Sequence, residues 1–155
     1  MSGPDPSPEG KRELVLELAQ RLRGIVLPEL GSMAGRAEKG GGAGGDVTFA
    51  VDALAEEALQ KFLAERAPRL AYYSEDRGLV AAPDATDVLV VDPIDGTRPA
   101  MAGLESACVA VALAPLGDGQ PTMGEVSFGA VVEIKSGDWY AAERGNGVRS
   151  SRTVA

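Results

Sequence analysis

The hydrophobic pattern of the first part of the chain predicts two amphipathic helices. Ser7 followed by Pro8 is typical of a helix start, because serine can cap the free backbone amides and proline fits the first turn. Pro28 is expected to end or kink this first helix, since proline removes a backbone donor. The first apolar stripe at helical spacing consists of Leu14, Leu18, Leu22, Ile25 and Val26.

The second predicted helix ends before Pro68 and follows a glycine-rich segment at residues 31–45. A Gly-x-Gly-x-x-Gly pattern at residues 40–45 lacks the preceding strand that a nucleotide-binding loop requires, so we expect a flexible loop there. The apolar stripe of the second helix consists of Leu54, Ala55, Ala58, Leu59, Phe62 and Leu63. The charged residues Glu56, Glu57 and Lys61 fit its solvent-exposed face.

The second part of the chain contains short apolar runs separated by glycine, proline and polar residues, a pattern typical of strands and turns. The predicted strands are residues 69–74, 87–92, 106–114, 124–134 and 138–142, with turns at 117–119 and 136–138. Helices followed by strands with short connections indicate an α+β fold, with two N-terminal helices packed on a largely antiparallel sheet. We expect residues 1–10 to form a flexible N-terminus and residues 11–155 a single α+β domain.

The composition supports one domain and argues against several classes of partner. A chain of 155 residues, 45% of them hydrophobic, can bury a core of its own. The net charge of −8 argues against binding to nucleic acid or to an acidic membrane surface. The N-terminus lacks the basic and apolar regions of a signal peptide, and no apolar run approaches the about 20 residues of a membrane span, so we expect a cytoplasmic protein. Cys108 lies in an apolar segment of a chain without histidine, which favours a packing role.

The acidic residues that follow two predicted strands are candidates for a metal site. Asp92 ends the strand at 87–92, and Pro93 and Gly96 would let the chain turn and present Asp92 and Asp95 to one point. Ser74-Glu75-Asp76 ends another predicted strand, and hard oxygen ligands of this kind suit Mg²⁺. The backbone amides of Gly96 and Thr97 would attract phosphate if a short helix starts there. The alternative is an Asp-Gly turn whose carboxylates only cap backbone groups.

The motif Asp92-Pro93-Ile94-Asp95-Gly96-Thr97 resembles the signature of the inositol monophosphatase and fructose bisphosphatase superfamily, which are Mg²⁺-dependent and often lithium-sensitive phosphatases. Three other stretches resemble the same family in the same order, most like its archaeal and bacterial members. These stretches are residues 48–52 before Glu56 and Glu57, residues 74–76, and residues 137–147.

The resemblance implies the role of each candidate residue. Glu75, Asp92 and the Ile94 carbonyl would bind a first Mg²⁺, and Asp92 and Asp95 would share a second, with two or three ions in total and inhibition by Li⁺. Thr97 would orient the attacking water, so Thr97, Glu75 and Asp92 would be the catalytic residues, and the amides of Gly96 and Thr97 would bind the substrate phosphate. The alternatives are that Glu75 and Asp76 only cap a strand end and that Thr97 only caps a helix.

The resemblance covers the N-terminal half of the family's pattern. The second half supplies a Trp-Asp-x-x-Ala segment whose aspartate completes the metal site, whereas Trp139 here is followed by Tyr140. Two functions are therefore compared. The first is Mg²⁺-dependent hydrolysis of a small phosphorylated metabolite such as inositol monophosphate or fructose-1,6-bisphosphate, with a homodimer or a complementing C-terminal half as partner. The second is a truncated, non-catalytic relic or interaction domain that keeps the fold and part of the metal site.

Overall fold

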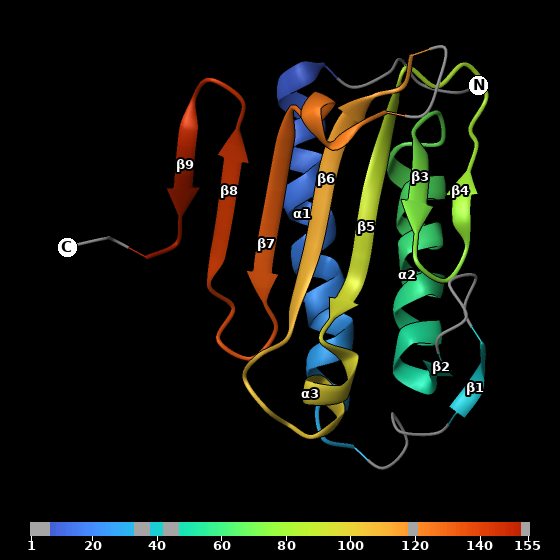
Figure 1. Cartoon of the computed structure of the whole chain (residues 1–155), viewed down its shortest axis with the longest axis vertical. Coiled ribbons are helices and arrows are strands. Elements are labelled where there is room, and N and C mark those ends of the chain that lie inside the picture. The colour runs from blue at the N-terminus through green and yellow to red at the C-terminus, as the bar shows by residue number, and fades with distance from the viewer. Residues whose placement is uncertain (1–6, 33–37, 42–46, 118–120, 153–155) are drawn as a thin grey trace.

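The protein is a seven-stranded sheet with two long helices packed on one face (Figure 1). The computed structural model describes residues 7–32, 38–41, 47–117 and 121–152. Helix α1 (Pro8–Val26) lies against strands β6 (Cys108–Pro115) and β7 (Phe128–Glu133), and helix α2 (Ala50–Arg66) lies against strand β5 (Asp87–Asp95). The predicted α+β fold, with two N-terminal helices on a largely antiparallel sheet, is confirmed.

Helix α1 runs from Pro8 to Val26 and begins as the sequence predicts. The Gly10 amide donates a hydrogen bond to Ser7 Oγ at 3.2 Å, which satisfies one of the amides that the first turn leaves free. Pro28 falls in a short 3-10 turn, Leu27–Glu29, that ends the helix. The helix includes Pro8–Gly10, which the sequence analysis assigned to a flexible N-terminus, and residues 1–6 of that expected segment lie outside the described residues.

Helix α2 runs from Ala50 to Arg66 and ends before Pro68, as predicted, but its buried face differs from the predicted stripe. Leu54 is 41% exposed, whereas Glu56 is buried at 5% exposure. The expectation that Glu56 lies on the solvent-exposed face is therefore wrong. The reason is that the helix turns the Val51, Ala55 and Leu59 stripe toward the sheet, which leaves Leu54 outside and brings Glu56 against the end of β3.

The main sheet has the strand order β4-β3-β5-β6-β7-β8-β9. Its strands are β3 (Ala71–Ser74), β4 (Gly78–Val80), β5 (Asp87–Asp95), β6 (Cys108–Pro115), β7 (Phe128–Glu133), β8 (Trp139–Glu143) and β9 (Gly147–Ser150). Neighbouring strands are antiparallel except β3 and β5, which are parallel, so β3 and β5 end at the same edge of the sheet. Each of the five predicted strands has a counterpart, and β4 and β9 are short hairpin partners that were not predicted.

Two local differences from the predicted elements have simple causes. Residues 124–127 are not strand, because Met123–Glu125 forms a 3-10 turn in which Glu125 accepts the Thr122 amide hydrogen at 2.7 Å. The expected loop in the glycine-rich segment contains strand β1 (Glu38–Gly41), which pairs with β2 (Val47–Phe49), so part of this segment is ordered by backbone pairing. The turn at 136–138 is confirmed, with Gly137 at φ 79°, whereas the predicted turn at 117–119 lies partly outside the described residues.

The two faces of the main sheet differ in what covers them. The face toward α1 and α2 carries fully buried residues such as Leu89, Val109 and Val132. The middle of the other face holds a shallow groove of about 410 Å³ lined almost entirely by small and aliphatic side chains, with Val90, Val131 and Tyr140 each 38% exposed. We call this surface the open face.

Candidate active site

The end of β5 positions the signature motif differently from the prediction. The strand does not turn at Pro93 but continues to Asp95, with an irregular register between Asp92 and Asp95 that accommodates the proline. The chain turns at Gly96, where φ is 90° and a Cβ atom would lie 2.6 Å from the Ser106 carbonyl oxygen. This turn starts the short helix α3 (Thr97–Met101), which meets the condition that the sequence analysis set for free amides at Gly96 and Thr97.

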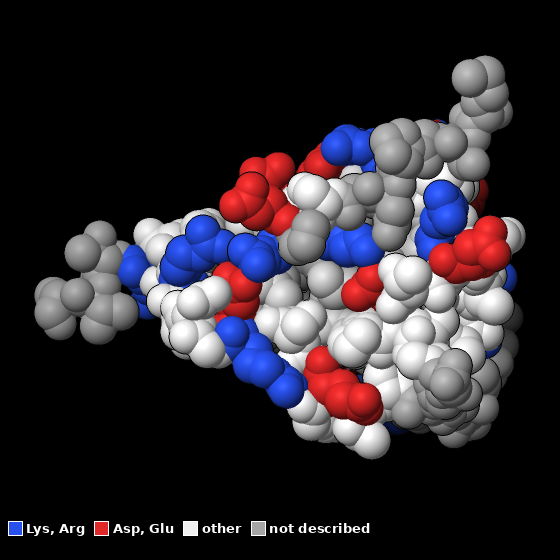
Figure 2. All heavy atoms as spheres, turned by 90° about the horizontal axis from the view of Figure 1, so that it is seen from above, with Lys and Arg blue, Asp and Glu red and all other residues white. Residues whose placement is uncertain are grey.

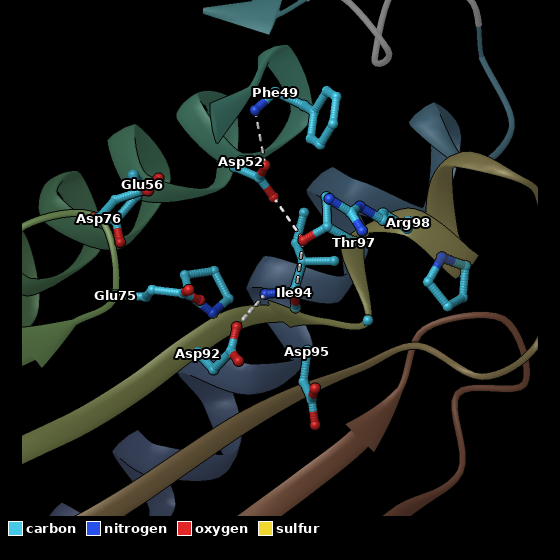
Figure 3. A pocket seen from close by; sticks show the side chains of 13 residues that line it. Phe49, Asp52, Glu56, Glu75, Asp76, Asp92, Ile94, Asp95, Thr97 and Arg98 are labelled. Carbon is cyan, nitrogen blue, oxygen red and sulfur yellow. Dashed lines mark hydrogen bonds between the residues drawn. The ribbon is translucent and has the colours of Figure 1, made fainter. Parts of the chain in front are cut away.

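A cavity of about 330 Å³ lies where β3 and β5 end and α2 begins (Figure 3). Parallel pairing brings the ends of β3 and β5 to the same place, and α2 packs beside them. Its six acidic lining residues are Asp52, Glu56, Glu75, Asp76, Asp92 and Asp95. Acidic side chains from three separate segments therefore gather at one edge of the sheet.

Asp92 and Glu75 are predicted ligands from two different strands, and both line this cavity. In Figure 3 the Glu75 side chain points toward Asp92. The pKa of Asp92 is raised to about 6. Partial burial is the main cause, and the nearby carboxylates of Asp95, Glu75 and Asp52 add to it, while a hydrogen bond from the Ile94 amide acts in the opposite direction. Carboxylates that repel one another form a suitable site for a divalent cation, because a bound cation would offset the repulsion.

The alternative role of Asp92, as a cap of backbone amides, accounts for only one of its two carboxylate oxygens. Asp92 Oδ1 accepts the Ile94 amide hydrogen at 3.1 Å. Within the described residues no hydrogen bond to Oδ2 is formed, so this oxygen is available to a ligand.

Asp95 lies at the rim of the cavity and does not point to the same position as Asp92. Its Oδ2 atom is 3.8 Å from Cys108 Sγ, and the side chain is exposed. The irregular register places Asp92 opposite Ala110 and Asp95 opposite Cys108, so the two residues are about two strand steps, or about 7 Å, apart along β6. After burial, the Asp95 carboxylate is the group that raises the pKa of Asp92 most. Within the described part of the chain, no three Asp, Glu or Cys side chains already lie close enough together to hold a metal ion.

Thr97 is held by a contact that the sequence analysis did not predict. Its Oγ1 atom is 3.1 Å from Asp52 Oδ1 and 3.1 Å from the Ile94 carbonyl oxygen, so the single hydroxyl hydrogen can be donated to either. The alternative reading of Thr97 as a helix cap is wrong, because Gly96 caps α3 and Thr97 is its first residue.

Asp52 links the site to the start of α2. Its Oδ2 atom accepts the Phe49 amide hydrogen at 2.9 Å, while Oδ1 faces Thr97. Burial is the main cause of the raised pKa of Asp52. A first sequence signal for Asp52 was its place at the third position of the helix, where an acidic side chain commonly accepts the amide hydrogen of the residue that precedes the helix. A second signal was that Asp52 and Glu56 are four residues apart and so share one side of the helix.

The comparison with known proteins assigns the chain to a family. The sequence model of the inositol monophosphatase family matches residues 11–153. The chain belongs to this family. Among curated relatives, the fructose-1,6-bisphosphatase/inositol-1-monophosphatase of Methanothermobacter thermautotrophicus is 30% identical over 141 residues, which cover 86% of this chain and 50% of the relative. The inositol-1-monophosphatase of Mesorhizobium japonicum is 28% identical over 66% of this chain and 36% of the relative.

Solved structures of the same family show the same fold. An inositol monophosphatase-fructose 1,6 bisphosphatase has a TM-score of 0.74 at 22% identity, covering 89% of this chain and 51% of the other. The extragenic suppressor protein suhB of Bartonella henselae has a TM-score of 0.73 at 19% identity, covering 90% and 51%. The chain therefore spans about half the length of these proteins or less. None of the helices in its described residues is long and apolar enough to span a bilayer.

Proposed function

We propose that this chain forms the N-terminal half of a Mg²⁺-dependent phosphomonoesterase that acts on a small phosphorylated metabolite such as inositol monophosphate or fructose-1,6-bisphosphate. The observation that carries this proposal is the cavity that Glu75 and Asp92 both line beside the Thr97–Asp52 pair. Membership of the family and the names of the curated relatives support the choice of substrates.

The residues present fit a divalent cation in their chemistry. Glu75, Asp92 and the Ile94 carbonyl would hold one ion, and Asp92 with Asp95 would hold a second after Asp95 turns from Cys108. A bound Mg²⁺ would lower the pKa of water and polarise a phosphate ester. Two or three ions, and inhibition by Li⁺, are part of the proposal.

The chain's own groups would orient the reaction. With its hydroxyl hydrogen donated to Asp52, Thr97 would keep its oxygen lone pairs free to accept a hydrogen bond from a water molecule and so position that water. The amides of Gly96 and Thr97, at the start of α3, would bind phosphate oxygens. Thr97, Glu75 and Asp92 are thus the proposed catalytic residues.

A second candidate function has its own support. The position of Asp95 beside Cys108, where it is exposed, favours a non-catalytic domain that keeps the fold and part of the metal site. In the enzymatic proposal, a second copy of the chain or a complementing C-terminal half supplies the remaining ligand. We expect no nucleic acid or membrane partner, because the net charge is −8. A cytoplasmic location is part of the proposal.

Phosphate release distinguishes the two functions. The purified chain, alone and with any polypeptide that copurifies with it, is assayed with inositol-1-phosphate and fructose-1,6-bisphosphate in the presence of Mg²⁺. Turnover that Thr97→Ala lowers by at least about 100-fold supports the enzyme, since such a loss is typical for a group that orients a reactant. Asp84→Asn, which alters an exposed carboxylate outside the cavity, is the matched control. A folded protein that binds Mn²⁺ and releases no phosphate supports the non-catalytic domain.

A further inference from the structure

Glu56 is a buried carboxylate whose presence packing does not explain. The side chain is 5% exposed on α2, and in the described structure neither carboxylate oxygen has a hydrogen-bond partner. The contact with the Arg77 guanidinium is long, at 3.6 Å between Oε2 and Nε. A buried charge with incomplete partners costs stability, and an apolar residue of similar size would commonly stabilise such a position.

The surroundings of Glu56 show what it touches. Glu56 and Asp76 lie beside each other in Figure 3, and the carboxylate of Asp76 is among the groups that raise the pKa of Glu56. Burial raises that pKa most, while the hydroxyl of Ser74 lowers it and therefore lies close to the carboxylate. Ser74 is itself fully buried, and its hydroxyl completes no hydrogen bond within the described residues.

The two side chains that contact Glu56 stand on either side of the proposed metal ligand Glu75. Ser74 precedes Glu75 and ends β3, and Arg77 lies two residues after it in the turn that leads to β4. Glu75 itself is exposed and makes no hydrogen bond in the described structure, so its own side chain does not fix its direction. Glu56 on α2 instead lies close to Ser74 and Arg77, so the segment that carries Glu75 packs against α2.

We propose that Glu56 is a positioning residue: from α2 it holds Ser74 and Arg77 so that the end of β3 directs Glu75 toward Asp92. This proposal rests on the proposed function, because Glu75 needs to point toward Asp92 only if the two residues bind the same metal ion. Residues that orient metal ligands commonly change metal affinity 10- to 100-fold when they are replaced.

The test uses the metal-free protein first. Glu56→Gln keeps the size of the side chain and removes its charge, and Glu57→Gln removes the same charge from the next, exposed position of the same helix. We expect Glu56→Gln to speed backbone hydrogen exchange in residues 74–78 by about 10-fold, because the turn opens more often. Glu57→Gln should leave exchange there unchanged. Unchanged exchange in Glu56→Gln would overturn the proposal whether or not the protein binds metal.

The second readout is Mn²⁺ binding, followed by electron paramagnetic resonance or calorimetry. We expect Glu56→Gln to bind Mn²⁺ about 10-fold more weakly than the unaltered protein while its melting temperature is equal or higher. A variant that exchanges faster yet binds Mn²⁺ with unchanged affinity would show a structural role only and would overturn the proposal. If the unaltered protein binds no Mn²⁺, the proposed function fails, and positioning of a metal ligand fails with it.

Discussion

The helix-covered core and the acidic cavity are adjacent and are built by the same elements, but burial of side chains stabilises the core and costs stability in the cavity. Helix α2 supplies Val51 and Leu59 to the core, and Asp52 and Glu56 to the cavity. Burial of an aliphatic side chain contributes about 1.5–3 kcal/mol of stability. Burial of the carboxylates raises their pKa, which means that it disfavours their charged forms. The core stabilises the fold, and the cavity costs stability where the function is proposed.

The opposite end of the molecule shows that this accumulation of like charge is local. Figure 2 views that end, and there basic and acidic side chains are interspersed. Lys11 pairs with Asp87 at the start of β5, with 2.7 Å between Nζ and Oδ2, and Arg12 pairs with Glu143 at 2.6 Å. Surface pairs of this kind contribute little, but they avoid the repulsion present in the cavity.

The largest expected effect lies in the core. Leu18→Ala removes a fully buried side chain between α1 and the sheet and is expected to cost about 3 kcal/mol of unfolding free energy, measured by urea denaturation. Leu104→Ala, the same change at an exposed site, should cost little. A loss below about 1 kcal/mol for Leu18→Ala would mean that the covered face is not the main source of stability.

The next largest effect separates binding from stability at the cavity. Asp92→Asn is expected to weaken Mn²⁺ binding by about 100-fold, or about 2.7 kcal/mol, because a charged ligand is lost. The metal-free variant should be more stable by about 1 kcal/mol, since a half-buried anion among anions is removed. Calorimetry and urea denaturation measure the two changes, with Asp84→Asn as control. If metal-free Asp92→Asn were less stable than the unaltered metal-free protein, the cavity would not cost stability, which would contradict its contrast with the core.

The pH dependence of the metal-free protein gives a smaller effect with a defined sign. The pKa of Asp92 is raised from 3.8 to about 6, so the folded state holds this proton more tightly than the unfolded state. The stabilisation from proton binding is complete below pH 3.8 and is lost as the pH rises through about 6. We expect this group to cost about 1 kcal/mol between pH 4.5 and 7, after allowance for solvent screening.

Urea denaturation of the unaltered protein and of Asp92→Asn over this pH range isolates the contribution of Asp92, because other acidic groups are common to both. The difference in unfolding free energy between the two should change with pH in the stated direction. Mg²⁺ affinity should rise over the same interval, because the cation competes with the proton. If the difference in unfolding free energy did not change with pH, the pKa of Asp92 would not be raised in the folded state.

The smallest effect on stability is expected on the open face. Val131→Lys should change the unfolding free energy of a single chain by at most about 0.5 kcal/mol, because the side chain is partly exposed. If a second copy or a complementing half covers this face, the same change should reduce association, measured by light scattering after size-exclusion chromatography. Leu79→Lys, on β4 away from the groove, is the control. Association that survives Val131→Lys would place the contact elsewhere.

The sequence by itself determined the elements whose signals are local. Ser7 and Pro8 mark the start of α1, Pro68 marks the limit of α2, and the apolar run before Asp92 marks the central strand. The signature at residues 92–97 was sufficient to indicate the family and the acidic site. These features depend on residues within a few positions of each other, so the pattern along the chain records them.

Only the tertiary structure decided which acidic residues meet and which face inward. The Thr97–Asp52 contact joins residues 45 positions apart, and it depends on how α2 packs beside β5. Glu56 is buried because packing on the sheet selects which side of α2 faces inward. The spacing of apolar residues along the chain did not predict that side. Asp95 faces outward because pairing with β6 keeps β5 extended past Pro93. In each case long-range packing, which local residue preferences do not encode, set the direction of the side chain.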